Sequence, residues 1–462
     1  MPHPFDGKII IIGTGPGALS CAYKLLLNKI EPVIIDNNSL PGGFMRSINY
    51  KDYTVDLGRK ELYSRIPVVN EFWETLLGHE YVEYDYRVGV LYDGKILEKS
   101  NKHLGIRRGL SLPKFILCVF DYLVSKWRFK KPDNYQDFKY NSQGKMMTQI
   151  FGQGFYERFT GRKWADLPLP IDHKKKKSVI YNIFKFFFGH GDESSSQLKW
   201  RHPVKGSGQI ISKLLENIKG LKGEVLYDVE IKNIDLKDDK IISLECKIDN
   251  KLEKIFPKII VSSIPLEVLY NIIFKYIPYK KEENISARRG TLLVYLFLKI
   301  ETKIENTWIN VSCPSLKIGR ITNYKSFNGE MVPKGKTCFC VEYFLNSDDD
   351  LFDDTENEIL EKTYVECSSI NLFKKRDLEH FLVFKLKNAN AAVSWEDFIN
   401  DPAKVKLYED LKMINNLYNI NRAGTDCATY AGLLASESIQ SKDKDSFERF
   451  TNPTSIDPWN NP

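Results

Sequence analysis

The hydrophobic and polar pattern at the start of the chain predicts a strand, a turn, a helix and a second strand. The β-branched run Ile9–Ile12 contains no polar residue, which is typical of a strand buried on both faces. Six residues, GTGPGA at 13–18, break this run, and apolar residues then recur at helical spacing through SCAYKLLLNK. A second apolar run ends at Asp36. The pattern therefore predicts one βαβ unit at the N-terminus.

The patterns further along the chain predict a mixture of helices and strands. Helical periodicity dominates from about 66 to 190, and strand-like alternation returns at 223–263 and again at 290–345. An acidic loop at 347–354 precedes a mixed stretch and a last helix that begins near Tyr430. We expect an α/β fold whose first sheet is interrupted by insertions and regains strands after residue 200.

The apolar segment 112–130 allows two interpretations. It could lie on a membrane surface, because bulky apolar residues are followed by a basic end. A buried helix of a second domain is favoured, since Asp121 interrupts the apolar stretch and no second anchor is evident. The segment 179–188 is ambiguous in the same way. No run reaches the 18 or so apolar residues of a membrane-spanning helix, and the polar start MPHPFDGK is no secretory signal, so a cytoplasmic protein is expected.

Composition and charge exclude several classes. The 462 residues are 42% hydrophobic and 27% charged, as in globular proteins, and the net charge of +7 is a mild excess. The only dense basic block, 174–177, is better interpreted as a solvated loop than as a nucleic-acid site, although anionic substrates would be attracted. The eight cysteines and seven histidines show neither metal-ligand spacing nor a catalytic triad. We therefore expect reduced thiols, no metal and no nucleic-acid partner.

The glycine turn matches the pattern that binds dinucleotides. Gly13 permits the tight turn, Gly15 lets the backbone approach a pyrophosphate, and Ala18 allows close packing of the helix on the strand. The following helix offers free N–H donors at its N-terminus. Asp36 ends the next strand, where its carboxylate would accept hydrogen bonds from a ribose.

The residues after Asp36 carry a resemblance to a known superfamily. Pro41-Gly42-Gly43, then Arg46 and Asp56-Leu57-Gly58, follow in the order and spacing of the glutathione-reductase-type flavoproteins. The chain resembles in particular the branch with amine oxidases, protoporphyrinogen oxidase, phytoene desaturases and UDP-galactopyranose mutase. This resemblance implies FAD as the cofactor and a Rossmann-like FAD-binding domain with an inserted α+β substrate domain.

The resemblance also implies domain boundaries and cofactor contacts. The FAD-binding domain would comprise 1–65, 200–270 and 405–450, the substrate domain 66–199 and 271–404, and a tail 451–462. Later segments at 203–208, 262–265 and 422–432 resemble the branch's other flavin-binding segments, with Val229 giving backbone hydrogen bonds to the adenine. The residues expected to bind the cofactor are Gly13, Gly15, Gly17, Ala18, Asp36, Gly42, Gly43, Arg46, Gly58, Val229, Pro265, Asp426 and Ala431.

Three functions are compatible with this resemblance. The first is an oxidoreductase that takes hydride from a small organic substrate to FAD. The second is a mutase-like enzyme acting on a nucleotide sugar, although Gly58-Arg59-Lys60-Glu61 stands where mutases carry a histidine-containing loop. The third is a flavin-binding protein without turnover. The resemblance places a small-molecule substrate, anionic or a nucleotide sugar, over the flavin, and the candidate catalytic residues are Arg59, Lys60, Arg320 and Tyr343.

Overall fold

The N-terminal βαβ unit forms as its sequence pattern predicts. The computed structural model describes residues 3–85, 87–98, 110–127, 131–169, 200–275, 289–390, 402–422 and 424–452. Strand β1 (Ile9–Ile12) leads through the glycine turn into helix α1 (Pro16–Leu27) and then into β2 (Pro32–Ile35). Both strands are buried along their whole length and pair in parallel, which explains why their sequences are continuously apolar.

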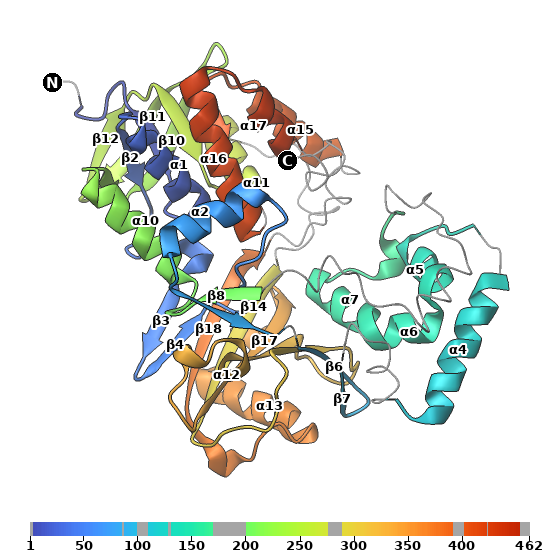
Figure 1. The fold of residues 1–462 in the computed structure, drawn as a ribbon. Helices are drawn as coiled ribbons and strands as arrows, with labels where there is room; N and C mark the ends of the chain where they lie inside the picture. Colours follow the sequence, from blue (N-terminus) through green and yellow to red (C-terminus); the bar gives the residue numbers. More distant parts are fainter. Residues whose placement is uncertain are drawn as a thin grey trace.

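The first sheet is parallel and is assembled from three separate stretches of sequence (Figure 1). Its order is β19-β13-β1-β2-β9, with β19 (Leu417–Asn419), β13 (Ile259–Ser262) and β9 (Glu224–Leu226) joining the N-terminal pair. These five strands fall within 1–65, 200–270 and 405–450. The predicted α/β class with a Rossmann-like sheet is confirmed.

Two apolar layers cover this sheet. On one face, Ile9, Ile11 and Ile34 pack against helices that include α1, and on the other Ile10 and Val33 pack against a small antiparallel sheet and two helices. The first layer comprises α1, α2 (Pro67–Leu77), α10 (Gly208–Gly220), α16 (Thr425–Ser441) and α17 (Asp445–Thr451). The second comprises β10 (Glu230–Lys237), β11 (Lys240–Ile248), β12 (Lys251–Ile255), α11 (Leu266–Phe274) and α15 (Pro402–Lys412).

A second, seven-stranded sheet forms the lower part of Figure 1. All of its neighbouring strands are antiparallel except β15 and β6, which are parallel. Its order is β18 (Leu378–Asn390), β14 (Arg289–Leu298), β17 (Thr337–Asn346), β16 (Arg320–Asn323), β15 (Trp308–Val311), β6 (Val88–Tyr92) and β7 (Lys95–Glu98). One face packs under α13 (Glu356–Ser369), and the other faces the β3–β4 hairpin (Ser47–Tyr50 and Tyr53–Asp56) of the first domain.

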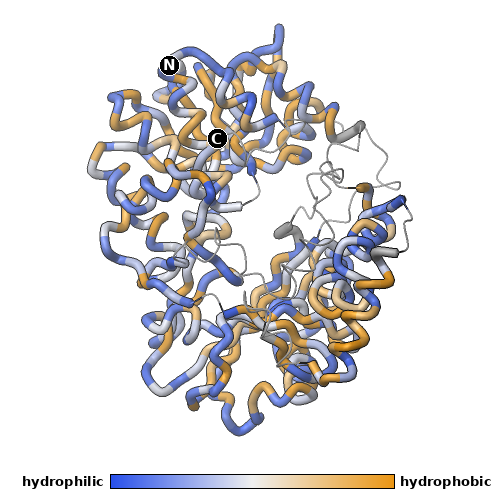
Figure 2. The backbone as a smooth tube through the Cα atoms, turned by 45° about the vertical axis from the view of Figure 1, so that its right-hand side comes forward, coloured by the Kyte–Doolittle hydropathy of each residue, from blue (hydrophilic) through white to orange (hydrophobic). Residues whose placement is uncertain are grey.

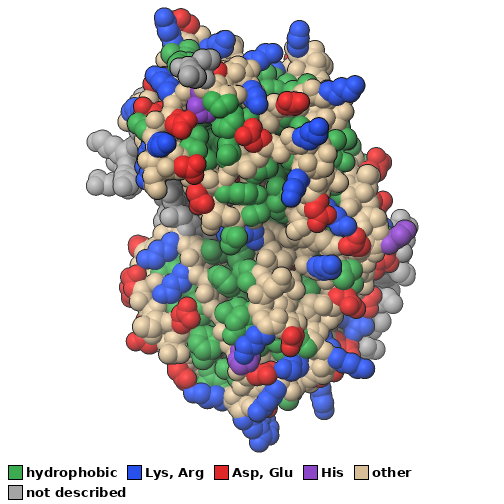
Figure 3. All heavy atoms as spheres, turned by 90° about the vertical axis from the view of Figure 1, so that its left-hand side faces the viewer, with side chains coloured by type: hydrophobic (Ala, Val, Ile, Leu, Met, Phe, Trp, Pro, Cys, Tyr) green, Lys and Arg blue, Asp and Glu red, His purple; other side chains and the backbone are tan. Residues whose placement is uncertain are grey.

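Short elements connect these layers. A two-stranded pair links the segments before and after the helical insertion, and single helical turns close several loops. They are β5 (Tyr81–Tyr84), β8 (Trp200–Pro203), α12 (Tyr324–Phe327), η1 (Gly43–Met45), η3 (Trp164–Asp166), η4 (Gly329–Met331), η5 (Asp350–Phe352) and η6 (Lys375–Asp377). In the space-filling view of Figure 3, acidic and basic side chains are interspersed over the face that these two domains present.

A helical unit projects from the second sheet. It comprises α4 (Leu112–Trp127), α5 (Tyr135–Gln143), α6 (Lys145–Thr148), a π-helical turn η2 (Gln149–Gln153) and α7 (Gly154–Thr160). The favoured interpretation of 112–130 as a buried helix is wrong for one face of α4, because five of its large apolar side chains are exposed: Leu112, Ile116, Leu117, Phe120 and Leu123. The hydropathy colouring of Figure 2 shows orange stretches along this unit. The segments 174–177 and 179–188 lie outside the described residues.

The described residues contain no helix that is both long and apolar enough to cross a membrane. Within the same ranges there is no group of three or more histidine, cysteine or carboxylate side chains that could hold a metal ion. All eight cysteines are free, and seven of them are buried.

Candidate functional site

Gly13 lies where the chain leaves β1 and passes close to β13. Its φ of +104° falls in the region that favours glycine, and a Cβ there would lie 2.0 Å from Ser263 Oγ. Ser263 holds this position because its hydroxyl donates to the Ile12 carbonyl at 2.8 Å. Any side chain at Gly13 would push the two strands apart.

Gly15 is different, because a Cβ built on it meets nothing within 4 Å. Gly15 is also the N-cap of α1, and no side chain caps this helix end. The unpaired N–H groups and the helix dipole make such an end a site for a phosphate group. The open space at Gly15 and the uncapped helix fit the pyrophosphate of a dinucleotide.

Asp36 lies beside this turn and is almost fully buried. Its Oδ2 accepts hydrogen bonds from the amide and hydroxyl of Thr14, at 2.8 and 2.5 Å. Its Oδ1 accepts from the amide and side chain of Asn38, at 2.8 and 3.0 Å. A carboxylate has about four acceptor positions, so a ribose hydroxyl would have to replace one of these donors.

The second glycine pair lies against the first turn. Gly42, with φ +98°, donates its amide to the carbonyl and hydroxyl of Thr14, both at 3.2 Å. A Cβ on Gly43 would meet nothing within 4 Å, and the Arg46 side chain donates to the Gly43 carbonyl at 3.2 Å. Thr14 thus links Asp36 to Gly42, and both Gly15 and Gly43 adjoin open space. The role of these residues in cofactor binding stays a prediction.

Other predicted cofactor residues have a packing role. A Cβ on Gly17 would lie 2.5 Å from the Ala428 carbonyl oxygen, and one on Gly432 would lie 2.0 Å from the Gly17 carbonyl oxygen. Ala18 and Ala431 are fully buried. Gly17 and Gly432 therefore permit the close contact of α1 with α16, which holds the uncapped end of α1 in place. The cofactor role predicted for Gly17, Ala18 and Ala431 stays a prediction.

Three predicted contacts come from later segments. The Val229 amide donates to the Asp36 carbonyl at 2.9 Å, so any backbone hydrogen bond to an adenine would have to come from the Val229 carbonyl. Pro265 is the N-cap of α11. Asp426 lies in the first turn of α16 and accepts a hydrogen bond from the Ser64 hydroxyl at 3.2 Å, and burial raises the pKa of its carboxyl group.

The DxG segment is held by a buried contact between a carboxylate and an imidazole that the sequence did not reveal. Asp56 Oδ2 lies 2.8 Å from His202 Nε2, and both side chains are fully buried. Asp56 Oδ1 accepts from the Ser47 hydroxyl at 2.6 Å and the Ser207 amide at 2.9 Å. Burial alone would raise the pKa of Asp56, but His202 and these donors hold it below its usual range. The pair joins β4 to β8, so the turn at Gly58 starts from a fixed position.

Beyond Gly58, cationic side chains meet carboxylates on the second sheet. The Arg320 guanidinium binds Glu342 through two hydrogen bonds, Nε to Oε1 at 2.9 Å and Nη2 to Oε2 at 2.6 Å. Glu342 Oε1 also accepts the Arg59 amide at 3.3 Å. The Arg59 guanidinium forms an ion pair with Glu61. Its central carbon also lies 4.1 Å from the centre of the Trp308 ring, on which the guanidinium stacks. We call Arg59, Lys60, Glu61, Arg320 and Glu342 the charged group.

Lys60 has a distinct place in the charged group. No described residue forms a hydrogen bond or an ion pair with its side chain, although Glu342 lies near enough to act on it electrostatically. Burial lowers the pKa of its ammonium, and Glu342 opposes this shift. The charged group contains three basic and two acidic side chains.

Tyr343, predicted as catalytic, lies on the wrong face of the sheet. Its hydroxyl donates to Thr363 Oγ1 at 3.1 Å, and its ring packs in the core under α13. Successive residues of a strand point to opposite faces, so Tyr343 is buried while Glu342 faces Arg320. The prediction for Tyr343 is wrong, and sequence reasoning missed Glu342 one position earlier.

The loop from Gly58 to Ser64 connects the two halves of the site. The Gly58 amide donates a hydrogen bond to the Tyr295 hydroxyl of the second sheet at 3.1 Å. At the other end, Ser64 donates to Asp426 of α16. The charged group thus lies between the second sheet and the N-terminus of α16, where the resemblance places the flavin ring and the substrate.

Comparisons with known proteins agree with this architecture. Residues 11–76 match the family model of an NAD(P)-binding Rossmann-like domain. The structure is similar to that of a reduced UDP-galactopyranose mutase, with a TM-score of 0.77 and 16% identity over 97% of this chain and 96% of that chain. A candidate protoporphyrinogen oxidase from Exiguobacterium sp. 255-15 gives a TM-score of 0.73 and 13% identity over 96% of this chain and 100% of that one.

A more distant similarity is to a putrescine oxidase variant, with a TM-score of 0.60 and 10% identity over 95% of this chain and 99% of that one. No curated protein sequence matches the chain. The resemblance predicted from the motifs is confirmed for the fold, which the chain shares with the amine-oxidase-like flavoproteins.

Proposed function

We propose that the chain is an FAD-dependent oxidoreductase that transfers hydride from a small organic substrate to the flavin. The observation that carries this proposal is the uncapped N-terminus of α1, with open space at Gly15 and with Asp36 and Gly43 beside it. FAD, when bound, supplies the hydride acceptor, so the protein needs no catalytic triad. Its own residues have to bind and orient the substrate and the cofactor and to stabilise the negative charge that they carry.

The charged group is suited to this task. Arg59, Lys60 and Arg320 offer N–H donors, and Arg and Lys stabilise negative charge on a carboxylate, a phosphate or a reduced ring. Glu342 fixes the Arg320 guanidinium through two hydrogen bonds, so the arginine is held in one orientation before a ligand arrives. The Trp308 ring stacks on the Arg59 guanidinium and so restricts its orientation.

A second function, a mutase-like rearrangement of a nucleotide sugar, is favoured by one observation. The charged group contains more basic than acidic side chains next to Trp308, which suits an anionic diphosphate. The similarity to a reduced UDP-galactopyranose mutase supports this candidate at the level of the fold. The two functions differ in the flavin's redox state, since the rearrangement leaves no net oxidation.

An absorbance spectrum and a substrate screen test both proposals. The purified protein is expected to show flavin bands and to release FAD on heating. Amines, other small organic substrates and nucleotide sugars are then offered to the oxidised enzyme and to the dithionite-reduced enzyme. Flavin bleaching by a substrate under anaerobic conditions supports the oxidoreductase, and turnover by reduced enzyme alone supports the mutase. A colourless protein that cannot be reconstituted with FAD would refute both.

A further inference from the structure

Helix α4 presents an apolar face to solvent. Leu112, Ile116, Phe120 and Leu123 recur at spacings of three and four, so they lie along one side, and Leu117 adjoins them. Their exposed fractions are large, for instance 57% for Ile116 and 64% for Phe120. Isolated exposed apolar residues are ordinary, but five on one helix form a continuous surface.

The opposite side of α4 is well packed. Cys118 and Tyr122 are buried, and the Asp121 carboxylate accepts the Met146 amide at 2.8 Å. Asp121, which interrupts the apolar sequence, therefore anchors α4 to α6. The helix is fixed to the helical unit by one face, so its exposed apolar face does not result from loose packing.

The sequence around α4 is strongly basic. Residues 99–131 contain one acidic residue, Asp121, and nine basic ones: Lys99, Lys102, Arg107, Arg108, Lys114, Lys126, Arg128, Lys130 and Lys131. This excess of eight is larger than the net charge of +7 of the whole chain, so the remainder of the protein carries no net positive charge. Four of the basic residues precede the exposed apolar positions along the chain, four follow them, and Lys114 lies among them.

We propose that α4 docks this protein on an anionic lipid bilayer. An apolar helix face enters the boundary between headgroups and acyl chains, and basic residues beside it are attracted to anionic headgroups. Each signal alone binds weakly, and the two together give stable but reversible attachment.

The charge pattern argues against two other occupants. A second copy of the chain, related by a two-fold axis, would bring two strongly basic segments together, which opposes association. A nucleic acid would engage the basic residues but offers no apolar surface for Ile116, Leu117 and Phe120. A bilayer with anionic headgroups offers both an apolar interior for the exposed side chains of α4 and negative charge for the basic residues.

Vesicle flotation with the full-length holoprotein tests this proposal. We expect the protein to float with vesicles of phosphatidylcholine and phosphatidylglycerol and to remain unbound with phosphatidylcholine alone. Raising the salt concentration should weaken binding, because it screens the basic residues. The substitutions Ile116→Gln, Leu117→Gln and Phe120→Gln together should lower the partition coefficient at least tenfold.

A matched variant controls for general loss of apolar surface. Leu252→Gln, Phe256→Gln and Val365→Gln remove three similarly exposed apolar side chains that lie outside α4, and binding should be unchanged. Flavin content reports whether each variant has folded. The proposal is overturned if the wild-type protein binds neither kind of vesicle, or if the α4 variant floats as well as the wild type. A dimer that the α4 variant dissociates, without vesicle binding, would identify a second copy as the partner instead.

Discussion

Arg320 and Glu342 face each other across β16 and β17 and are joined by two parallel hydrogen bonds, of 2.9 and 2.6 Å. Glu342 is 3% exposed and Arg320 13%, so the pair is nearly removed from water. Burial would raise the pKa of Glu342, but Arg320 holds it below its usual range. This pair fixes one cationic side of the proposed substrate site.

Removing the Arg320 side chain should lower stability more than replacing it with lysine, which only weakens its pairing with Glu342. Arg320→Ala leaves the Glu342 carboxylate buried without its main counter-charge, and the free energy of unfolding is expected to fall by about 3–5 kcal/mol. Arg320→Lys keeps the charge but loses the two-point geometry, so it should fold and retain FAD while its turnover falls. Denaturant titration, flavin content and steady-state kinetics check this. Wild-type kinetics in Arg320→Lys would remove this residue from the site.

Gly15→Ala should separate cofactor binding from folding. The new Cβ meets no protein atom, so the stability of the apoprotein should change by no more than about 1 kcal/mol, the usual cost at an N-cap. It does occupy the space beside the helix N-terminus, and FAD affinity is expected to fall at least tenfold.

Gly13→Ala is the contrasting variant. There the Cβ would collide with Ser263 Oγ, so folding and FAD binding should be lost together. Reconstitution titrations with FAD and thermal denaturation of the apoproteins measure both effects. Full flavin occupancy in Gly15→Ala would contradict the assignment of the pyrophosphate to this helix end.

Gly432→Ala should disturb the contact between α1 and α16. Its Cβ would lie 2.0 Å from the Gly17 carbonyl oxygen, and such overpacking costs about 1–3 kcal/mol. Because α1 would shift, FAD should also dissociate faster. Gly220→Ala, at the end of α10 where nothing lies within 4 Å, is the matched control and should be neutral or slightly stabilising. Equal melting temperatures for the two variants would refute the packing role.

The Asp56–His202 pair should make stability sensitive to acid. The pKa of Asp56 is lowered in the folded protein, so its contribution is present above the unfolded-state pKa of about 3.9 and is lost as the pH falls through the lower folded value. Asp56→Asn should lower the free energy of unfolding by about 3–5 kcal/mol at pH 7.

The difference between Asp56→Asn and the wild type should shrink below about pH 4, because Asp56 then binds a proton in the unfolded state and, at still lower pH, in the folded state as well. Asp52→Asn, at an exposed neighbouring position, should show no such difference at any pH. Urea titrations at several pH values give the comparison. A constant difference across this range would mean that the charge of Asp56 does not matter.

Lys60→Met should reduce anion binding without a loss of stability. The pKa of Lys60 is lowered in the folded state, so its charge disfavours folding at neutral pH, and the neutral variant should be as stable as the wild type or more so. Binding of pyrophosphate, followed through the flavin spectrum, should weaken about tenfold, as expected for one charge-assisted hydrogen bond. Lys303→Met, at an exposed position, is the control. Unchanged pyrophosphate binding in Lys60→Met would place the anion elsewhere.

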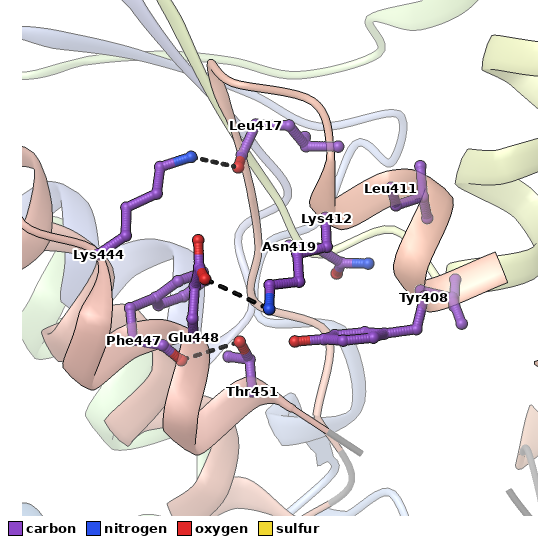
Figure 4. A pocket seen from close by; sticks show the side chains of 10 residues that line it. Tyr408, Leu411, Lys412, Leu417, Asn419, Lys444, Phe447, Glu448 and Thr451 are labelled. Carbon is purple, nitrogen blue, oxygen red and sulfur yellow. Dashed lines mark hydrogen bonds and ion pairs between the residues drawn. The ribbon is translucent and has the colours of Figure 1, made fainter. Parts of the chain in front are cut away.

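One groove of the structure lies away from the proposed chemistry. It runs between α15, β19 and α17 and is lined by Tyr408, Lys412 and Glu448 among others (Figure 4). Lys412 and Glu448 form an ion pair across it at 3.5 Å, and Lys444 donates to backbone carbonyls. Its polar groups are engaged with one another, so it adds nothing to the proposed function.

The sequence by itself determined the βαβ unit, the glycine turn and the place of Asp36. These features depend on backbone requirements over a short stretch: continuous burial of Ile9–Ile12, the positive φ of Gly13 and an uncapped helix end after Gly15. Such requirements restrict which residue types are possible locally, so they are visible as spacing and composition.

The tertiary structure alone decided which side chains meet. Asp56 and His202 are 146 positions apart, and Glu342, not Tyr343, faces the site because the β16–β17 register places it opposite Arg320. The Val229 amide is engaged by Asp36, and α4 keeps an apolar face in solvent although its sequence also suits a buried helix. Contacts between residues that are distant in the sequence form only when the two sheets have assembled. A local hydrophobic pattern indicates that a side chain will be buried, but it does not indicate which distant residue will contact it.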